Sequence, residues 1–160
     1  MSGEPVDPRD VFRVFNEIAI IEQLSRALFE ARLPHGVLAS HFGVLNHLVR
    51  VADGRTPLEL ARAFQVPKTT LSHTLMLLER RGWISMRANP EDRRSKRVWI
   101  TEAGRAFRED AIAALLPDIE ALLGRIDGTV LAELLPRLEE VRRVLDDSRD
   151  LVGARPREKL

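Results

Sequence analysis

The chain has 160 residues, of which 44% are hydrophobic and 31% charged, and it contains no cysteine. This composition is typical of a single globular domain, and it excludes a disulfide framework, a zinc knuckle and a thiol redox switch. No apolar run approaches the roughly 20 residues of a membrane span, and the polar amino terminus has no apolar signal core. We therefore expect a cytoplasmic protein that makes no contact with a membrane.

The net charge is only +1, but the charged residues are unevenly distributed. Arg50 to Ile100 hold 11 Lys and Arg against 5 Asp and Glu, whereas the rest of the chain holds 14 against 19. A basic segment is usually just a solvated face. If it coincides with a motif that binds a polyanion, however, it indicates a polyanionic partner.

The first expected element, after a loose tail at residues 1–6, is a helix from about residue 8 to Arg32. Asp7, Pro8 and Asp10 are favourable residues for its first turn. Its apolar positions extend beyond one stripe and include Val11, Phe12, Val14, Phe15, Ile18, Ile20, Ile21, Leu24 and Leu28. This is more apolar surface than a surface helix of a monomer needs, so the pattern predicts a partner.

A second helix is expected from about Ala39 to Ala52, ending at Asp53-Gly54. Its start is not well marked, because Leu38 stands where a capping residue is expected. A leucine side chain cannot accept hydrogen bonds from the free N–H groups of a helix start. The pattern therefore leaves the first residue of this helix open by a few positions.

The segment Thr56 to Thr101 contains the most organised pattern of the chain. Thr56 and Glu59 form a T-x-x-E capping box with Pro57 at the first helical position, and a tight turn follows at Phe64 to Pro67. Leu71, Leu75 and Leu78 then give an inward stripe to a second helix from about Lys68 to Arg81. Two helices joined in this way predict a helix-turn-helix.

After Gly82 the apolar period changes from 3.6 to 2, which indicates two strands, Trp83 to Ala88 and Arg97 to Thr101. The loop Asn89 to Lys96 joins them. We expect Val98 and Ile100 to face inward, with Arg97 and Trp99 outward. A helix-turn-helix followed by a hairpin is a winged helix.

Two further helices are expected at the carboxyl end. Thr101 caps the first, which runs to about Arg125, and Gly128 and Thr129 separate it from a last helix that runs to about Arg149. Pro117 and Pro136 fall inside these helices and should bend them. The last helix has a wide apolar face formed by Leu131, Leu134, Leu135, Leu138, Val141, Val144 and Leu145. In a monomer this face and the first helix would be exposed to water, so we expect an obligate twofold dimer.

Several phrases of the sequence resemble those of MarR-family transcription regulators. They are Leu78-Glu79-Arg80-Arg81-Gly82-Trp83-Ile84, Asp92-Arg93-Arg94, and Val98-Trp99-Ile100-Thr101-Glu102-Ala103-Gly104. The last two match the family's wing pattern, D-x-R followed by V-x-L-T-x-x-G, with Ile100 for Leu. The resemblance covers roughly residues 8 to 146.

This resemblance implies a mainly α fold with a small β-hairpin wing (α+β), in which a winged helix-turn-helix is flanked by N- and C-terminal dimerisation helices. Residues 1–160 would form one chain of this type, with dimerisation helices at 8–33 and 102–147, a DNA-binding lobe at 39–101 and a flexible tail at 148–160. It also implies that Arg55 adds a very short strand to the hairpin. The expected function is that of a homodimeric regulator, acting as a repressor, that binds a pseudo-palindromic operator in double-stranded DNA.

Recognition helices place residues near their amino end against base edges in the major groove. The residues expected to do so here are Lys68, Thr69, Thr70, Ser72 and His73. In the wing, the family position makes Arg94 the residue inserted into the minor groove, where a narrow groove favours arginine. Asp92 would hold the stem of Arg94 through a charge-assisted hydrogen bond. Arg93, Lys96 and Arg97 would neutralise phosphates.

Many members of the family respond to a small, often aromatic, anion that binds between the dimer helices and the DNA lobe. The candidate lining of such a pocket is His35, His41, Phe42, Asn46 and Trp83, although the same residues also suit a core or a helix start. The four histidines are not spaced as metal ligands, and no nucleophilic triad or phosphate loop is present. We therefore expect no metal, no cofactor and no enzyme activity.

Three other functions remain compatible with the pattern. A winged helix can serve as a protein-interaction module, although such a module would tolerate apolar or acidic residues where this chain has Arg93, Arg94 and Lys96. The chain could also be an architectural protein that binds DNA without sequence preference. A small-molecule enzyme on a helical dimer would need convergent polar groups that the sequence does not offer.

Overall fold

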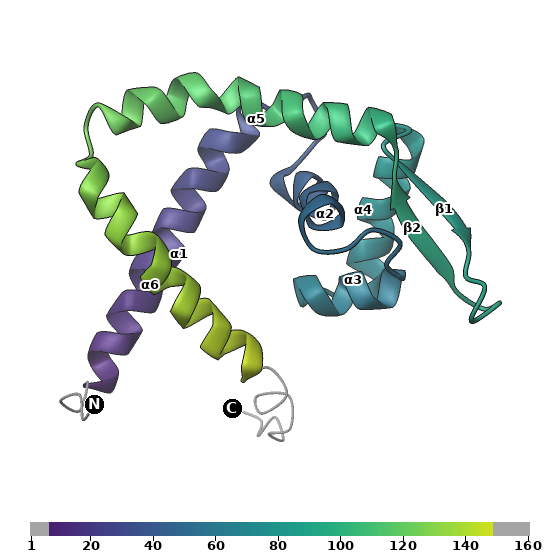
Figure 1. Cartoon of the computed structure of the whole chain (residues 1–160), viewed down its shortest axis with the longest axis horizontal. Coiled ribbons are helices and arrows are strands. Elements are labelled where there is room, and N and C mark those ends of the chain that lie inside the picture. Colours follow the sequence, from purple (N-terminus) through teal and green to yellow (C-terminus); the bar gives the residue numbers. More distant parts are fainter. Residues whose placement is uncertain (1–6, 149–160) are drawn as a thin grey trace. The chain divides into compact units, whose positions relative to one another are not determined.

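The computed structural model describes residues 7–148, so the tail expected at 1–6 and all but the first residue of the tail expected at 148–160 lie outside the described residues. The elements follow in the order α1 (Pro8–Glu30), α2 (Ala39–Arg50), α3 (Pro57–Phe64), α4 (Lys68–Arg80), β1 (Ile84–Ala88), β2 (Lys96–Ile100), α5 (Glu102–Leu123) and α6 (Gly128–Asp147) (Figure 1). The chain forms two compact units, residues 1–115 and residues 116–160. The expected mainly α fold with a small hairpin wing is confirmed.

The core of the first unit lies between the helix-turn-helix, α2 and the hairpin. Its fully buried side chains include Leu45 and Leu48 of α2, Leu60 of α3, Leu78 of α4 and Val98 of β2. Burying a leucine or valine of this kind contributes about 1.5–3 kcal/mol. The inward stripe predicted for α4 is confirmed, because Leu71 and Leu75 belong to the same core.

The start of α2, which the sequence left open, is at Ala39. Two other side chains, His41 within α2 and Glu30 at the end of α1, replace the missing cap. The Leu38 N–H donates to Nδ1 of His41 at 2.8 Å, and the Ala39 N–H donates to Oε1 of Glu30, the last residue of α1, at 2.8 Å. Two N–H donors at this helix start are thus satisfied without a polar side chain at position 38.

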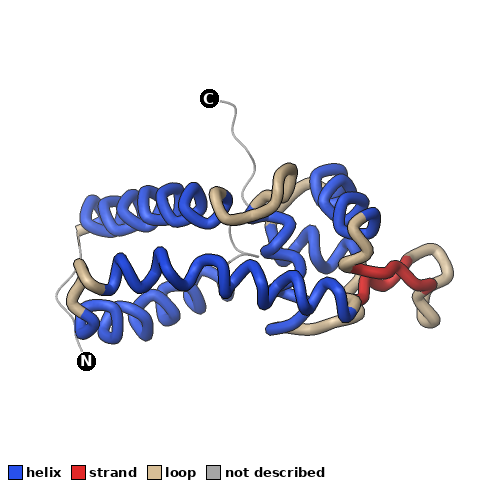
Figure 2. The backbone as a smooth tube through the Cα atoms, turned by 90° about the horizontal axis from the view of Figure 1, so that it is seen from above, coloured by secondary structure: helices blue, strands red, loops and turns tan. Residues whose placement is uncertain are grey.

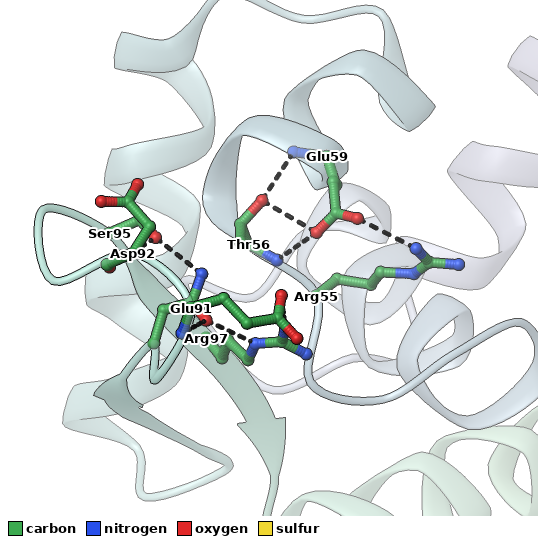
Figure 3. Close-up of polar contacts among 8 residues, drawn as sticks. Arg55, Thr56, Glu59, Glu91, Asp92, Ser95 and Arg97 are labelled. Carbon is green, nitrogen blue, oxygen red and sulfur yellow. Dashed lines mark hydrogen bonds and ion pairs between the residues drawn. The ribbon is translucent and has the colours of Figure 1, made fainter.

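The turn between α3 and α4 has the predicted capping box and one feature that the sequence did not reveal. The Glu59 N–H donates to Oγ1 of Thr56 at 3.3 Å, while the Thr56 N–H donates to Oε2 of Glu59 at 2.7 Å (Figure 3). Gln65 ends α3 in the left-handed region, with φ 52°. Glycine usually occupies such a position, so the turn carries a small conformational cost here.

The hairpin pairs β1 with β2 in antiparallel register, from Ile84 opposite Ile100 to Ala88 opposite Lys96. The predicted contribution of Arg55 is confirmed by its bridge to Val98. Trp99 differs from the expectation of an outward residue, since it is only partly exposed. Its ring lies so close to Gly54 that an added Cβ there would meet it at 2.6 Å. The turn after α2 therefore covers one face of the wing.

The last two helices begin at side-chain caps. Oγ1 of Thr101 accepts from the Gly104 N–H at 3.0 Å at the start of α5, as predicted. In the second unit, the expectation that Gly128 and Thr129 separate two helices is wrong. Asp127 caps α6 by accepting from the Thr129 N–H at 2.9 Å, so Gly128 is already helical. Pro117 and Pro136 lie inside helices, as expected.

Candidate nucleic-acid interface

The exposed side of α4 carries the residues expected to contact bases. Its polar residues Lys68, Thr69, Thr70, Ser72 and His73 are all exposed. Ser72 donates its hydroxyl to the backbone oxygen of Lys68 at 2.8 Å, which leaves the lone pairs of Oγ free to accept. Met76 and Arg80 extend the same exposed side, with the Arg80 guanidinium 3.1 Å from the sulfur of Met76.

The loop at the tip of the wing, residues 89–95, is held together by its own hydrogen bonds. Asn89 is buried, and its Nδ2 donates to Oγ of Ser95 at 2.9 Å. The Ser95 N–H donates to the backbone oxygen of Asp92 at 3.0 Å. The tube in Figure 2 shows that this loop projects from the end of the strands. Its internal bonds give the projection a defined conformation.

Asp92 acts differently from the role expected for it. Its Oδ1 accepts from the backbone N–H of Arg94 at 2.9 Å, and not from the guanidinium. It therefore fixes the backbone at the wing tip. Arg93, Arg94 and Lys96 are exposed, and none of the three has an ion-pair partner within residues 7–148.

Arg97 is not a free cation, in contrast to its expected role. Its Nε donates to Oδ1 of Asn89 at 2.9 Å, and its Nη2 pairs with Oε2 of Glu91 at 2.7 Å (Figure 3). Only 29% of the Arg97 side chain is exposed, against 78% for that of Glu91. The guanidinium of Arg97, on β2, thus stabilises the loop at residues 89–95.

Asp53, which the sequence reading missed, holds the root of the wing. Its Oδ1 accepts from the N–H groups of Gly54 and Ile100, both at 3.0 Å, and its Oδ2 pairs with Arg105 at 3.0 Å. One carboxylate thus connects the turn after α2, the end of β2 and the start of α5. No local pattern signals this role, because its partners are 47 and 52 residues away in the sequence.

A cavity of about 800 Å³ lies within the first unit. Of the expected pocket residues, only Phe42 and Asn46 line it. The other lining residues come from five helices and include Phe29, Phe64, Thr70, Thr74, Arg108 and Ile112. Arg108 is nearly covered, with 14% of its side chain exposed, and its Nε donates to Oδ1 of Asn46 at 3.0 Å. It also pairs with Glu109.

The remaining three expected pocket residues do not line this cavity. His35 lies exposed in the loop before α2, where its backbone oxygen accepts from Arg81 at 3.1 Å. Trp83 stacks on Phe107 with ring centroids 3.7 Å apart. His41 is buried at the start of α2, and burial lowers the pKa of its imidazole against the opposing effect of Glu30. Each of the three therefore has a structural contact of its own.

Other classes of site find little support in the described part of the chain. Within residues 7–148, no three His, Cys, Asp or Glu side chains gather as metal ligands would. No helix there is both long and apolar enough to cross a bilayer.

A helix-turn-helix followed by a hairpin with a cationic tip defines a winged-helix protein. Residues 35–95 match the family model of the MarR family. Among solved structures, a mutant MarR from E. coli complexed with operator DNA is 27% identical, with a TM-score of 0.67 over 85% of this chain and 99% of that one. The lobe around residues 35–95 is therefore similar to that of MarR-family winged-helix transcriptional regulators.

Two more distant structures share the fold. BldR from Sulfolobus solfataricus is 23% identical, with a TM-score of 0.72 over 86% of this chain and 99% of that one. A MarR transcriptional regulator from Methanosarcina mazei is also 23% identical, with a TM-score of 0.71 over 81% and 94% of the two chains. In both cases the similarity covers more than four fifths of this chain and nearly all of the other.

Proposed function

We propose that this chain is a sequence-specific DNA-binding repressor that acts as a homodimer and is released from its operator by a small-molecule effector. The proposal rests on one observation: a single lobe, residues 39–101, presents both an exposed polar helix and a basic wing tip. MarR from E. coli, which shares this architecture, has been crystallised with operator DNA. The polar residues of α4 read base edges, and Arg94 enters the minor groove beside them.

Dimerisation is supported by apolar surface on helices outside the lobe. No residue of α1 or α6 is buried. Their exposed apolar residues include Phe12, Ile21, Leu24, Leu134, Leu135, Leu138 and Leu145. Surface of this extent is covered in a stable protein, and a second copy is its natural partner. Residues 8–33 and 102–147 are thus the proposed dimerisation helices, and the two lobes bind half-sites about 10 base pairs apart.

The proposed effector site is the cavity in the first unit. Its walls are mainly apolar and aromatic, and the covered Arg108 supplies a positive charge at its polar part. These features suit a compact ligand with an apolar or aromatic body and an acidic group. Thr70 and Thr74 of α4 line the cavity. A ligand bound there would therefore change how that helix packs against the rest of the lobe. It relieves repression only if it binds the form that fits DNA less well.

The test is binding of the full chain to fluorescent duplexes containing its own upstream region, with random duplexes as competitors. Specific binding should survive a large excess of the competitor. Affinity should fall by about 10³ to 10⁵ between ~50 and ~200 mM salt, because some 6 to 10 phosphates are neutralised. Equal affinity for both duplexes would identify a sequence-neutral architectural protein instead. A flat salt response would overturn the electrostatic basis of the proposal.

A further inference from the structure

The wing contains an internal ion pair at the place where a DNA-binding wing would present a cation. Glu91 reaches back from the loop toward Arg97 (Figure 3), and its Oε2 pairs with Nη2 of that residue. Oδ1 of Asn89 accepts from the Nε of the same guanidinium. The Glu91 N–H also donates to that Asn89 oxygen, at 3.2 Å. Asn89, Glu91 and Arg97 therefore form a closed set of contacts.

The two ends of the ion pair differ in their surroundings. The carboxylate of Glu91 is largely in water, whereas Arg97 is mostly covered and fixed by Asn89. An ion pair with one exposed member contributes little to stability. A phosphate oxygen can replace such a carboxylate, because guanidinium binds both groups with similar geometry. Arg97 would keep its bond to Asn89 during the exchange.

We propose that Glu91 competes with DNA phosphate for Arg97 and thereby penalises binding to DNA that does not fit the wing. The inference rests on the proposed DNA-binding function and assigns a specificity role to one acidic residue. On a non-fitting duplex, Glu91 retains Arg97, which then makes no contact with phosphate. On a fitting duplex, the remaining contacts bring a phosphate close enough to displace Glu91, and Arg97 adds a contact.

The test is a double-mutant cycle on the full chain with a random-sequence duplex, using Glu91→Gln, Arg97→Gln and the double variant. Glutamine at 97 retains a donor for Asn89 but has no charge. Glu91→Gln should tighten binding by about fivefold, the upper range for an exposed pair. It should also make the slope of log affinity against log salt more negative by about 0.9 per wing, which is one added phosphate contact. In the Arg97→Gln background, both effects should disappear.

The controls separate this mechanism from simpler ones. Glu91→Ala should act as Glu91→Gln does, and thermal melts of all variants show whether the fold is kept. Equal tightening with and without Arg97 would mean that Glu91 acts through its charge at long range, which overturns the proposal. Weaker binding by Glu91→Gln would mean that Glu91 positions Arg97 for DNA, which also overturns it.

The outcome also distinguishes this inference from the function on which it rests. If the unaltered chain binds DNA with the expected salt dependence but the cycle shows no coupling, only the role of Glu91 fails. If the unaltered chain binds no duplex, both proposals fail together.

Discussion

His41 serves as the cap of α2 from inside the helix. Its Nδ1 accepts from the Leu38 N–H, so the bond requires that this nitrogen carry no proton. Burial lowers the pKa of His41 below its ordinary 6.5, while the neighbouring Glu30 carboxylate opposes the shift. The folded chain therefore binds the proton of His41 less readily than the unfolded chain does.

This shift predicts a pH dependence of stability. A group with a lowered folded pKa stabilises the fold fully above its unfolded pKa, and this stability is lost as pH falls through the folded value. Stability should thus decline from about pH 6.5 downward. His41→Gln keeps an acceptor at the third helical position and should reduce the decline between pH 7.5 and 5, as measured by urea unfolding at fixed protein concentration.

His47 requires a matched control in that experiment. Its pKa is also lowered, first by burial and then by Arg55. His47→Gln alone should remove a separate part of the decline, and the double variant should be nearly flat over this range. Glu59, whose pKa is lowered mainly by its hydrogen bond with the Thr56 backbone, titrates below the range and does not interfere. A His41→Gln variant with the full original decline would contradict the assignment to His41.

At the scale of elements, the wing works through its backbone as well as its charge. Asp92 and Asn89 define the loop, and strand β2 beneath it is tied to the rest of the lobe by Asp53. The exposed Arg94 therefore stands on a rigid support. A preorganised cation loses less entropy when it enters a groove than a cation on a loose loop does.

Removing that cation should weaken DNA binding without changing the fold. Arg94→Ala is expected to raise the Kd by about tenfold and to lessen its salt dependence by about one phosphate equivalent. Fluorescence anisotropy measures both, and light scattering checks that the association state is unchanged. An Arg94→Ala variant that binds as tightly as the unaltered chain would remove the wing from the proposed interface.

For the whole molecule, the exposed apolar residues of α1 and α6 predict the association state. Obligate dimers have no stable folded monomer, so stability should rise with protein concentration. Light scattering at micromolar concentration should give twice the chain mass. Leu138→Glu, at a residue of α6 that is 37% exposed, should shift the chain toward monomer. Leu58→Glu on α3, at 39% exposed, is the matched control and should leave the dimer intact. A monomeric unaltered chain would contradict the dimer.

The elements of this protein were largely determined by local sequence. The capping box of Thr56 and Glu59, the stripe of Leu71, Leu75 and Leu78, and the alternation around Val98 each involve neighbours within a few residues. Such patterns fix hydrogen bonds and apolar faces before any distant contact forms. They were sufficient to predict the winged helix and to place the exposed polar residues of α4.

The tertiary structure alone decided which distant side chains meet. Glu30 caps α2 from the end of another helix, and Asp53 joins the wing root to α5. Glu91 forms an ion pair with Arg97, which the sequence placed against phosphate. The cavity has a similar origin, since its lining comes from five helices and omits His35, His41 and Trp83. Periodicity shows which side of an element is buried, but not what faces it, because that depends on how the elements pack.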